Sequence, residues 1–202
     1  MIKSNKKLLA ESFNTSQSIF TILRKNGFEA NTKFKSWKAN QLNLTENIIY
    51  LGHTLLLAIE GFKVGLLVTN DNYILDGNHR YVATMLSKPK ANFFGTEINN
   101  SINSIIPLAS HPSKPFFEYL EEDTCALDMN ICNATIDDIL NAIFYGKYID
   151  PKFYNKDKAI SWLEKIGGKQ VLEKRLKNLQ SNKLLSDEFF TLVNSNLALR
   201  PE

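Results

Sequence analysis

The change from strand-like to helix-like patterning at Asp76-Gly77 restricts the folds open to this chain more than any other feature of its sequence. Before it, residues 64–68 form a short apolar run and residues 73–75 a second one, with a polar cluster between them, so a strand, a turn and a returning strand are predicted. After it, residues 79–87 follow helical spacing. A strand that passes through glycine directly into a helix predicts a mixed fold, of the α+β or α/β-like class.

The surrounding residues extend this mixed pattern. Thr45 is a good N-cap for a helix that Gly61 would end, and residues 92–98 predict a further strand. Residues 32–35 alternate charged and uncharged side chains, which indicates a half-buried strand only weakly. We therefore expect one small mixed-sheet domain over residues 1–110.

The second part of the chain has a different character. Thr135 and Asp138 have the spacing of a capping box before a clean apolar stripe, and Asn155 is placed to cap another helix. Residues 111–202 are therefore expected to form an α-helical C-terminal region. The pattern leaves open whether this region docks on residues 1–110 or forms its own core.

The charge, the apolar stretches and the cysteine content limit the classes of protein to which this chain could belong. The 202 residues carry 24 basic and 21 acidic side chains, a formal net charge of +3, which does not by itself indicate a nucleic-acid binder and would not repel a phosphate-bearing ligand. There is no apolar stretch of membrane-spanning or signal-peptide length, so we expect a cytoplasmic protein with no membrane partner. The two cysteines, Cys125 and Cys132, argue against a disulfide framework or a zinc site.

Residues 76–80, Asp-Gly-Asn-His-Arg, have the chemistry of an anion site. The first N–H groups of a helix lack internal partners, and the helix dipole adds partial positive charge there. Gly77 lets a ligand approach the backbone, while His79 and Arg80 add donors within the first turn. Asp76 is placed to hold Mg²⁺ against phosphates, to accept a proton from an attacking hydroxyl, or simply to cap the turn.

A plainer interpretation stands beside this one. Asp-Gly is a common turn, and the same residues would serve as a turn followed by an exposed helix start. Among the other residues, His53 is interpreted as a core or interface histidine, and Phe93-Phe94 as core. The lysines of residues 165–183 are interpreted as a solvated helix face, with a DNA contact left open.

The stretch around Gly77 resembles the ParB/sulfiredoxin superfamily over about residues 30–100. ParB-type domains carry a Gly-x-x-Arg-x-x-Ala box at a helix start, sulfiredoxins carry Gly-Cys-His-Arg-Tyr-x-Ala, and ParB-fold serine kinases carry Asp-Gly-x-His-Arg. The positions that match one or more of these forms are Asp76, Gly77, His79, Arg80, Tyr81 and Ala83. The resemblance implies a ParB/sulfiredoxin-like small mixed-sheet domain.

The resemblance also implies nucleotide binding. The expected ligand is a nucleoside triphosphate or diphosphate (ATP, ADP or CTP) with Mg²⁺, and its phosphates would contact Gly77, Asn78, His79 and Arg80. The sulfiredoxin catalytic cysteine falls at Asn78, and an amide cannot supply a thiolate nucleophile, so sulfiredoxin activity is rejected.

Three functions follow as hypotheses. The first is a kinase-like phosphotransferase or NTPase in which Asp76, His79 and Arg80 are catalytic, Asp76 is the metal ligand, and the acceptor is an unidentified small molecule or protein. The second is a DNA-associated ParB-like binder or nuclease. The third is a member of the fold that has lost catalysis and binds a partner through its helical half.

Overall fold

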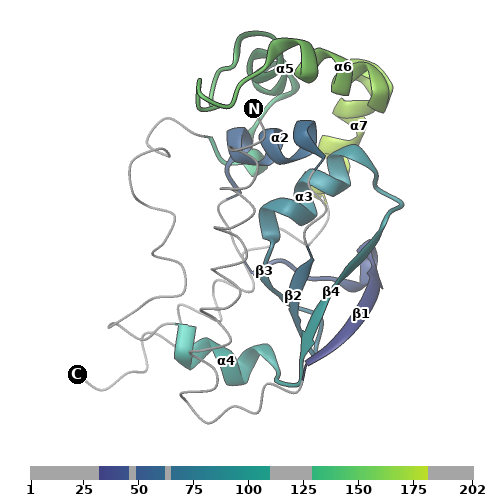
Figure 1. Ribbon diagram of the computed structural model, residues 1–202, viewed down its shortest axis with the longest axis vertical. Coiled ribbons are helices and arrows are strands. Elements are labelled where there is room, and N and C mark those ends of the chain that lie inside the picture. Colours follow the sequence, from purple (N-terminus) through teal and green to yellow (C-terminus); the bar gives the residue numbers. More distant parts are fainter. Residues whose placement is uncertain (1–31, 46–48, 62–64, 110–128, 182–202) are drawn as a thin grey trace, which may run out of the picture.

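The computed structural model describes residues 32–45, 49–61, 65–109 and 129–181 (Figure 1). Within these ranges the protein has one four-stranded sheet and six α-helices, so the predicted mixed α+β class is confirmed. The strands are β1 (Thr32–Lys38), β2 (Leu66–Thr69), β3 (Ile74–Asp76) and β4 (Asn92–Ile98). The α-helices are α2 (Leu51–Glu60), α3 (Asn78–Ser87), α4 (Ile102–Ala109), α5 (Ile136–Tyr145), α6 (Lys156–Ile166) and α7 (Gly168–Ser181), with short 3₁₀ turns at Ala39–Gln41 and Ile131–Asn133.

The sheet has the strand order β1-β4-β2-β3, with both parallel and antiparallel pairs. β2 and β3 form an antiparallel hairpin, and β4 is parallel to β2 and antiparallel to β1. A parallel pair needs a crossover between its strands, and α3 supplies it. This topology places the start of α3 directly at the end of the short strand β3.

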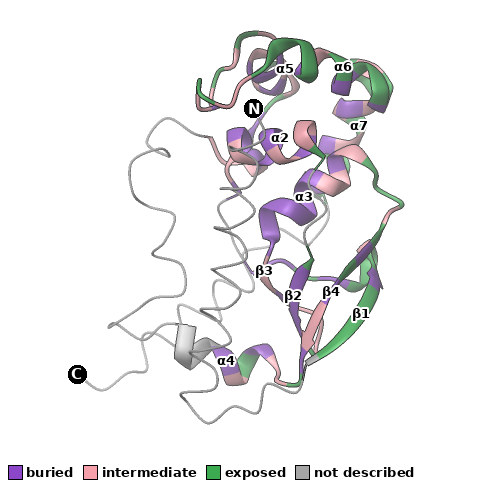
Figure 2. Ribbon diagram, viewed as in Figure 1, coloured by how far each residue is buried: buried purple, intermediate pink, exposed green. Residues whose placement is uncertain are grey.

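One face of the sheet packs against α3. Trp37 on β1 and Phe93 on β4 are paired across the strands and are both buried, and the Phe93 ring lies 4.8 Å from the ring of Tyr81 on α3. On the opposite face of the same strands, Phe34 and Phe94 are 79% and 52% exposed. Most of β1 is exposed (Figure 2). The prediction that Phe93-Phe94 is core is therefore correct for Phe93 and wrong for Phe94.

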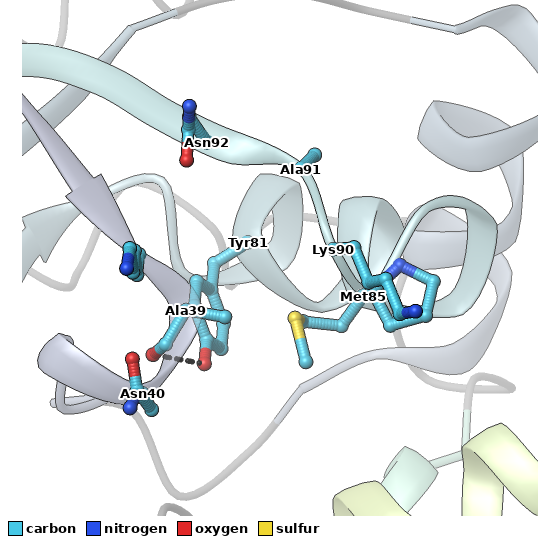
Figure 3. A pocket seen from close by; sticks show the side chains of 9 residues that line it. Ala39, Asn40, Tyr81, Met85, Lys90, Ala91 and Asn92 are labelled. Carbon is cyan, nitrogen blue, oxygen red and sulfur yellow. Dashed lines mark hydrogen bonds between the residues drawn. The ribbon is translucent and has the colours of Figure 1, made fainter.

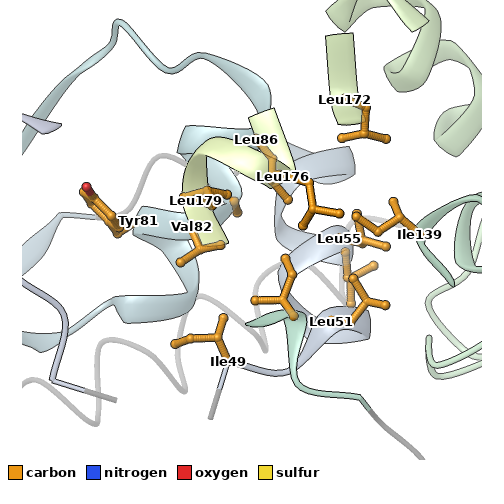
Figure 4. Close-up of a cluster of buried hydrophobic side chains, with 14 of the residues drawn as sticks. Ile49, Leu51, Leu55, Tyr81, Val82, Leu86, Ile139, Leu172, Leu176 and Leu179 are labelled. Atoms are coloured by element: carbon orange, nitrogen blue, oxygen red, sulfur yellow. The ribbon is translucent and has the colours of Figure 1, made fainter. Parts of the chain in front are cut away.

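Helices α5, α6 and α7 pack on α2 and α3 and share one hydrophobic cluster with the sheet (Figure 4). The cluster includes Leu55 of α2, Val82 of α3 and Leu176 of α7, all buried. Residues 49–51 and 129–131 also pair through their backbones, with Leu51 N–H donating to Met129 O at 2.7 Å. The described part of the helical region thus docks on the sheet-containing part and does not have a core of its own.

An arginine of α7, Arg175, caps the C-terminal end of helix α3. Arg175 Nη1 donates to the carbonyl oxygens of Leu86 and Ser87 at 2.6 and 2.8 Å, and the Trp162 indole of α6 donates to the Ser87 hydroxyl at 3.1 Å. A cation at a helix C-terminus is favourable because it satisfies the last carbonyls and complements the dipole. The C-terminal end of α3 is therefore fixed by residues more than 70 positions away in the chain.

Most predicted helix ends are confirmed, and one is wrong. Gly61 ends α2 in the left-handed region, Thr135 and Asp138 form the capping box of α5, and Asn155 caps α6. Thr45 does not cap a helix: α2 begins at Leu51, and the Thr45 hydroxyl instead donates to the Ile74 carbonyl. Among the described helices, none combines the length and apolar character that crossing a membrane requires.

Candidate functional site

The predicted order of strand, glycine and helix is confirmed at residues 74–80. β3 ends at Asp76, Gly77 is the N-cap of α3 with φ 104°, and the helix begins at Asn78. A Cβ on residue 77 would lie 2.6 Å from the Leu66 side chain and 3.0 Å from two guanidinium nitrogens of Arg80. Glycine is therefore required here both for its positive φ and for the space that the arginine fills.

The Arg80 side chain folds back over Gly77 and lies at the N-terminal end of its own helix. Its Nη2 atom is 2.8 Å from Asp76 Oδ1, and the side chain is only 8% exposed. Although the distance makes this an ion pair, no guanidinium N–H is aligned for a hydrogen bond: Nε, Nη1 and Nη2 have no hydrogen-bond partner among the described residues. A buried guanidinium with unused donors, at the positive end of a helix dipole, favours an anion.

Asn78 has a structural contact that the sequence could not indicate. Its side chain is buried and bonds in both directions to Thr45: Oδ1 accepts from Thr45 N–H at 3.1 Å, and Nδ2 donates to Thr45 Oγ1 at 3.2 Å. Nδ2 also lies 3.3 Å from the Ile74 carbonyl. Because both ends of this amide are used within the protein, a ligand contact from Asn78 would have to come from its backbone.

His79 faces the segment that precedes α2. Its Nε2 accepts the backbone N–H of Tyr50 at 3.0 Å, and its ring stacks on the Tyr50 ring at a centroid distance of 5.9 Å. His53, on the first turn of α2, contacts the His79 ring edge-on at 5.0 Å. Since Nε2 accepts a hydrogen bond, a neutral His79 carries its proton on Nδ1. His79 therefore joins the start of α3 to the start of α2.

Burial, followed by the neighbouring His79 and Arg80, lowers the pKa of His53 from its ordinary 6.5 to about 3. The unfolded chain then binds a proton that the folded chain excludes between these two values, so the free energy of unfolding should fall as the pH is lowered through this window. The slope contributed by one group is at most about 1.4 kcal/mol per pH unit. We expect urea titrations at a series of pH values to show this dependence in the wild type and less of it in His53→Gln. Equal slopes in the two proteins would contradict the burial of a neutral His53.

Asp76 lies at the turn as the sequence predicted, and it forms an ion pair there with Arg80. Among the described residues, no three His, Cys, Asp or Glu side chains are grouped as a metal site would require. Mg²⁺ retains waters and phosphate oxygens when few protein ligands are present. Asp76 therefore fits, at most, as a single protein ligand to a magnesium ion held mainly by a nucleotide.

A cavity of about 410 Å³ lies on another side of α3 (Figure 3). It is lined by residues from the end of β1, from Tyr81 and Met85 of α3, and from the loop before β4, and none of Asp76, Gly77, His79 or Arg80 lines it. The Tyr81 hydroxyl at its edge donates to the Ala39 carbonyl at 3.1 Å. The turn at Gly77 and this cavity are therefore two separate features of the same helix.

The contacts of Thr45, Tyr50 and His53 with this turn are not among those that the sequence predicted. Thr45 was predicted to cap a helix, and His53 to be a core or interface residue, which describes its burial but not its contact with His79. Tyr50 contributes a backbone N–H, and no side-chain pattern signals such a contact. The apolar neighbours of His53 were the only available signal of its burial.

Comparisons with known proteins add no assignment: neither a protein-family model, nor a curated protein, nor a solved structure matches this chain.

Proposed function

We propose that the N-terminus of α3 binds a phosphate group of a nucleoside triphosphate or diphosphate (ATP, ADP or CTP, with Mg²⁺) and that the protein transfers or hydrolyses a phosphoryl group. The observation that carries this proposal is the buried Arg80 guanidinium, which has no hydrogen-bond partner among the described residues and lies over Gly77. A buried cation with unused donors is costly unless an acceptor arrives.

Phosphate suits this site better than other anions. The guanidinium presents its donors as a planar fork that matches two oxygens of a phosphate. The start of a helix adds backbone N–H groups and partial positive charge, and Gly77 has no side chain to keep the Arg80 guanidinium away from that helix end. A tetrahedral group with several oxygens can use all of these donors together, whereas a halide cannot.

The proposed roles follow the contacts. Arg80 would bind the phosphate and stabilise the charge that develops on it, and Asp76 would hold Arg80 in place through their ion pair. Asp76 would act as base or Mg²⁺ ligand only by giving up part of that pairing. His79 would orient the turn, because its Nε2 atom already accepts the Tyr50 N–H.

The described helices of the C-terminal region do not have the connections of a helix-turn-helix, which the DNA-associated alternative would favour. A helix-turn-helix joins its two helices through about three to four residues. Here residues 146–155 connect α5 to α6, and Gly167 alone separates α6 from α7. Neither connection within residues 129–181 has the expected length, so the phosphoryl-transfer hypothesis remains the first.

Two arginines at opposite ends of α3 provide a matched test. We expect ATP, ADP or CTP with Mg²⁺ to raise the melting temperature of the wild type, since a ligand at about 100 times its Kd adds about 2.7 kcal/mol. Arg80→Ala should abolish this shift. Arg175→Ala removes an arginine that caps the other end of the helix, so it should lower the melting temperature but keep the shift.

Release of inorganic phosphate, or its transfer to an added acceptor, tests the catalytic part separately. A thermal shift without any turnover would support nucleotide binding at this site but contradict the proposed catalytic activity. No shift with any nucleotide, or an equal shift in wild type and Arg80→Ala, would overturn the proposal.

A further inference from the structure

The cavity beside Tyr81 and Met85 has the volume and the apolar walls of a small-molecule site. Its volume of about 410 Å³ falls in the range that is usual for pockets that hold small ligands, about 300–1,000 Å³. Tyr81 and Met85 are four positions apart on α3, and the Met85 side chain extends toward Tyr81 (Figure 3). Pro89, in the loop after α3, adds a third apolar side chain to the lining.

The walls of this cavity are held by bonds within the protein. The Tyr81 hydroxyl donates to the Ala39 carbonyl at 3.1 Å, and the same carbonyl accepts the backbone N–H of Leu42 at 3.2 Å. The loop between α3 and β4 is closed by the Ala91 N–H, which donates to the Lys88 carbonyl at 2.9 Å. Because these bonds need no ligand, the cavity is preformed, and a ligand would bind without the cost of ordering its walls.

The charge in the lining is positive. Lys38 and Lys90 line the cavity, and no carboxylate of the described residues does so. The amides of Asn40 and Asn92 add groups that can donate or accept hydrogen bonds. Burial raises the pKa of Tyr81 to about 12, so its hydroxyl stays protonated at neutral pH and adds no negative charge. The charge that a ligand meets in the cavity is therefore that of the two lysines.

We propose that this cavity binds a small organic anion with an apolar body, whose charged head pairs with Lys38 and Lys90 and whose body contacts Met85 and Pro89. A lysine ammonium acts as a point charge, so a carboxylate and a phosphate monoester both suit as the head. A cation of the same shape would be repelled, and a neutral molecule would gain the apolar contacts alone. The inference is independent of the proposed phosphate site, because Arg80 does not line this cavity.

Amide chemical shifts of the isotope-labelled full chain test the proposal with probes that share one aromatic ring. The anionic probes are phenylacetate and phenyl phosphate, the neutral one is phenylacetamide, and the cationic one is phenethylamine. We expect the anions to shift the amides of residues 38–40 and 90–92 and to bind more tightly than the neutral probe, and the cation to bind least. The affinities of the two anions then identify the preferred head group.

Variants separate the roles of charge and apolar contact. Lys38→Gln and Lys90→Gln should each weaken binding of the anions about 2- to 5-fold, and the double substitution should reduce it to that of phenylacetamide. Lys88→Gln is the matched control: Lys88 is exposed in the same loop but does not line the cavity, so salt should screen its charge from the ligand. Met85→Ala should weaken binding of the anionic and neutral probes, and Met85→Leu should restore it.

The side chains of Lys38 and Lys90 are exposed, so their variants should keep the melting temperature of the wild type. Equal affinities for phenylacetate, phenyl phosphate and phenylacetamide would overturn the proposal, as would the absence of shifts with every probe. Shifts confined to residues 77–80 would also overturn it, because the anion would then bind at the Arg80 turn. The same would follow if Lys88→Gln weakened binding as much as Lys38→Gln and Lys90→Gln, because the attraction would then be general and not that of a site.

Discussion

Replacing Gly95 with alanine is expected to lower the free energy of unfolding by about 3 kcal/mol, at the upper end of the usual cost of overpacking. Gly95 lies on β4 opposite Leu66 of β2, and a Cβ there would be 2.0 Å from the Leu66 carbonyl oxygen and 2.6 Å from its nitrogen. The obstructing atoms are backbone, so no side-chain rotation can relieve the clash. Urea unfolding followed by circular dichroism measures the change.

Gly65 provides the matched control for this substitution. A Cβ at residue 65 would meet only Gly95 Cα at 3.4 Å and Phe94 O at 3.5 Å, which are close to ordinary contacts, and the residue is exposed. Gly65→Ala should therefore change stability far less than Gly95→Ala. Similar stabilities for the two variants would contradict the close pairing of β2 with β4.

Leu176→Ala is expected to destabilise the whole chain by about 2–5 kcal/mol, the usual cost of truncating a buried leucine. Leu176 lies on α7, is 3% exposed, and belongs to the cluster that also includes residues of β1, α2 and α3. Because the core is shared, both parts of the chain should unfold in one transition. Lys177→Ala, on the exposed side of the same helix, should have little effect, since an exposed ion pair contributes at most about 1 kcal/mol.

The two tryptophans report on the two parts separately. Trp37 is buried on β1, and Trp162 is buried on α6. In the single-tryptophan variants Trp162→Phe and Trp37→Phe, fluorescence should give coincident unfolding midpoints, and Leu176→Ala should lower both. A midpoint for Trp37 that Leu176→Ala leaves unchanged would instead support two independent domains divided near residue 110.

The parts of the fold that the sequence predicted well depend on local signals. Residues 92–98 form β4 as predicted, and the hairpin of β2 and β3 follows its apolar runs and polar turn. The capping box at Thr135 requires residues only three positions apart. Gly77 was predicted to form the turn at the start of α3 because it lies between a strand pattern and a helix pattern. Each of these features is encoded within one short window.

The features that were missed depend on distant partners. Thr45 is a good N-cap in isolation, but its backbone N–H and hydroxyl bond to Asn78 and Ile74, about thirty positions away. Phe94 follows Phe93 directly, and only the neighbouring strand β1 decides which of the two rings is buried. The ion pair of Asp76 and Arg80 has local spacing, but the absence of an aligned acceptor for the guanidinium among the described residues emerges only in three dimensions.

Helix α3 has one end at the proposed ligand site and the other end beneath Arg175 of α7. Its final carbonyls are satisfied by a residue from the helical part of the chain, so exchanging that part for an unrelated module would leave them without this donor. The two parts of the chain therefore depend on each other for stability. Replacing everything after a junction within residues 110–128 with an unrelated sequence would destabilise α3, even where the Asp-Gly-Asn-His-Arg turn is kept unchanged. The turn and the helices that support α3 should therefore be inherited as one unit.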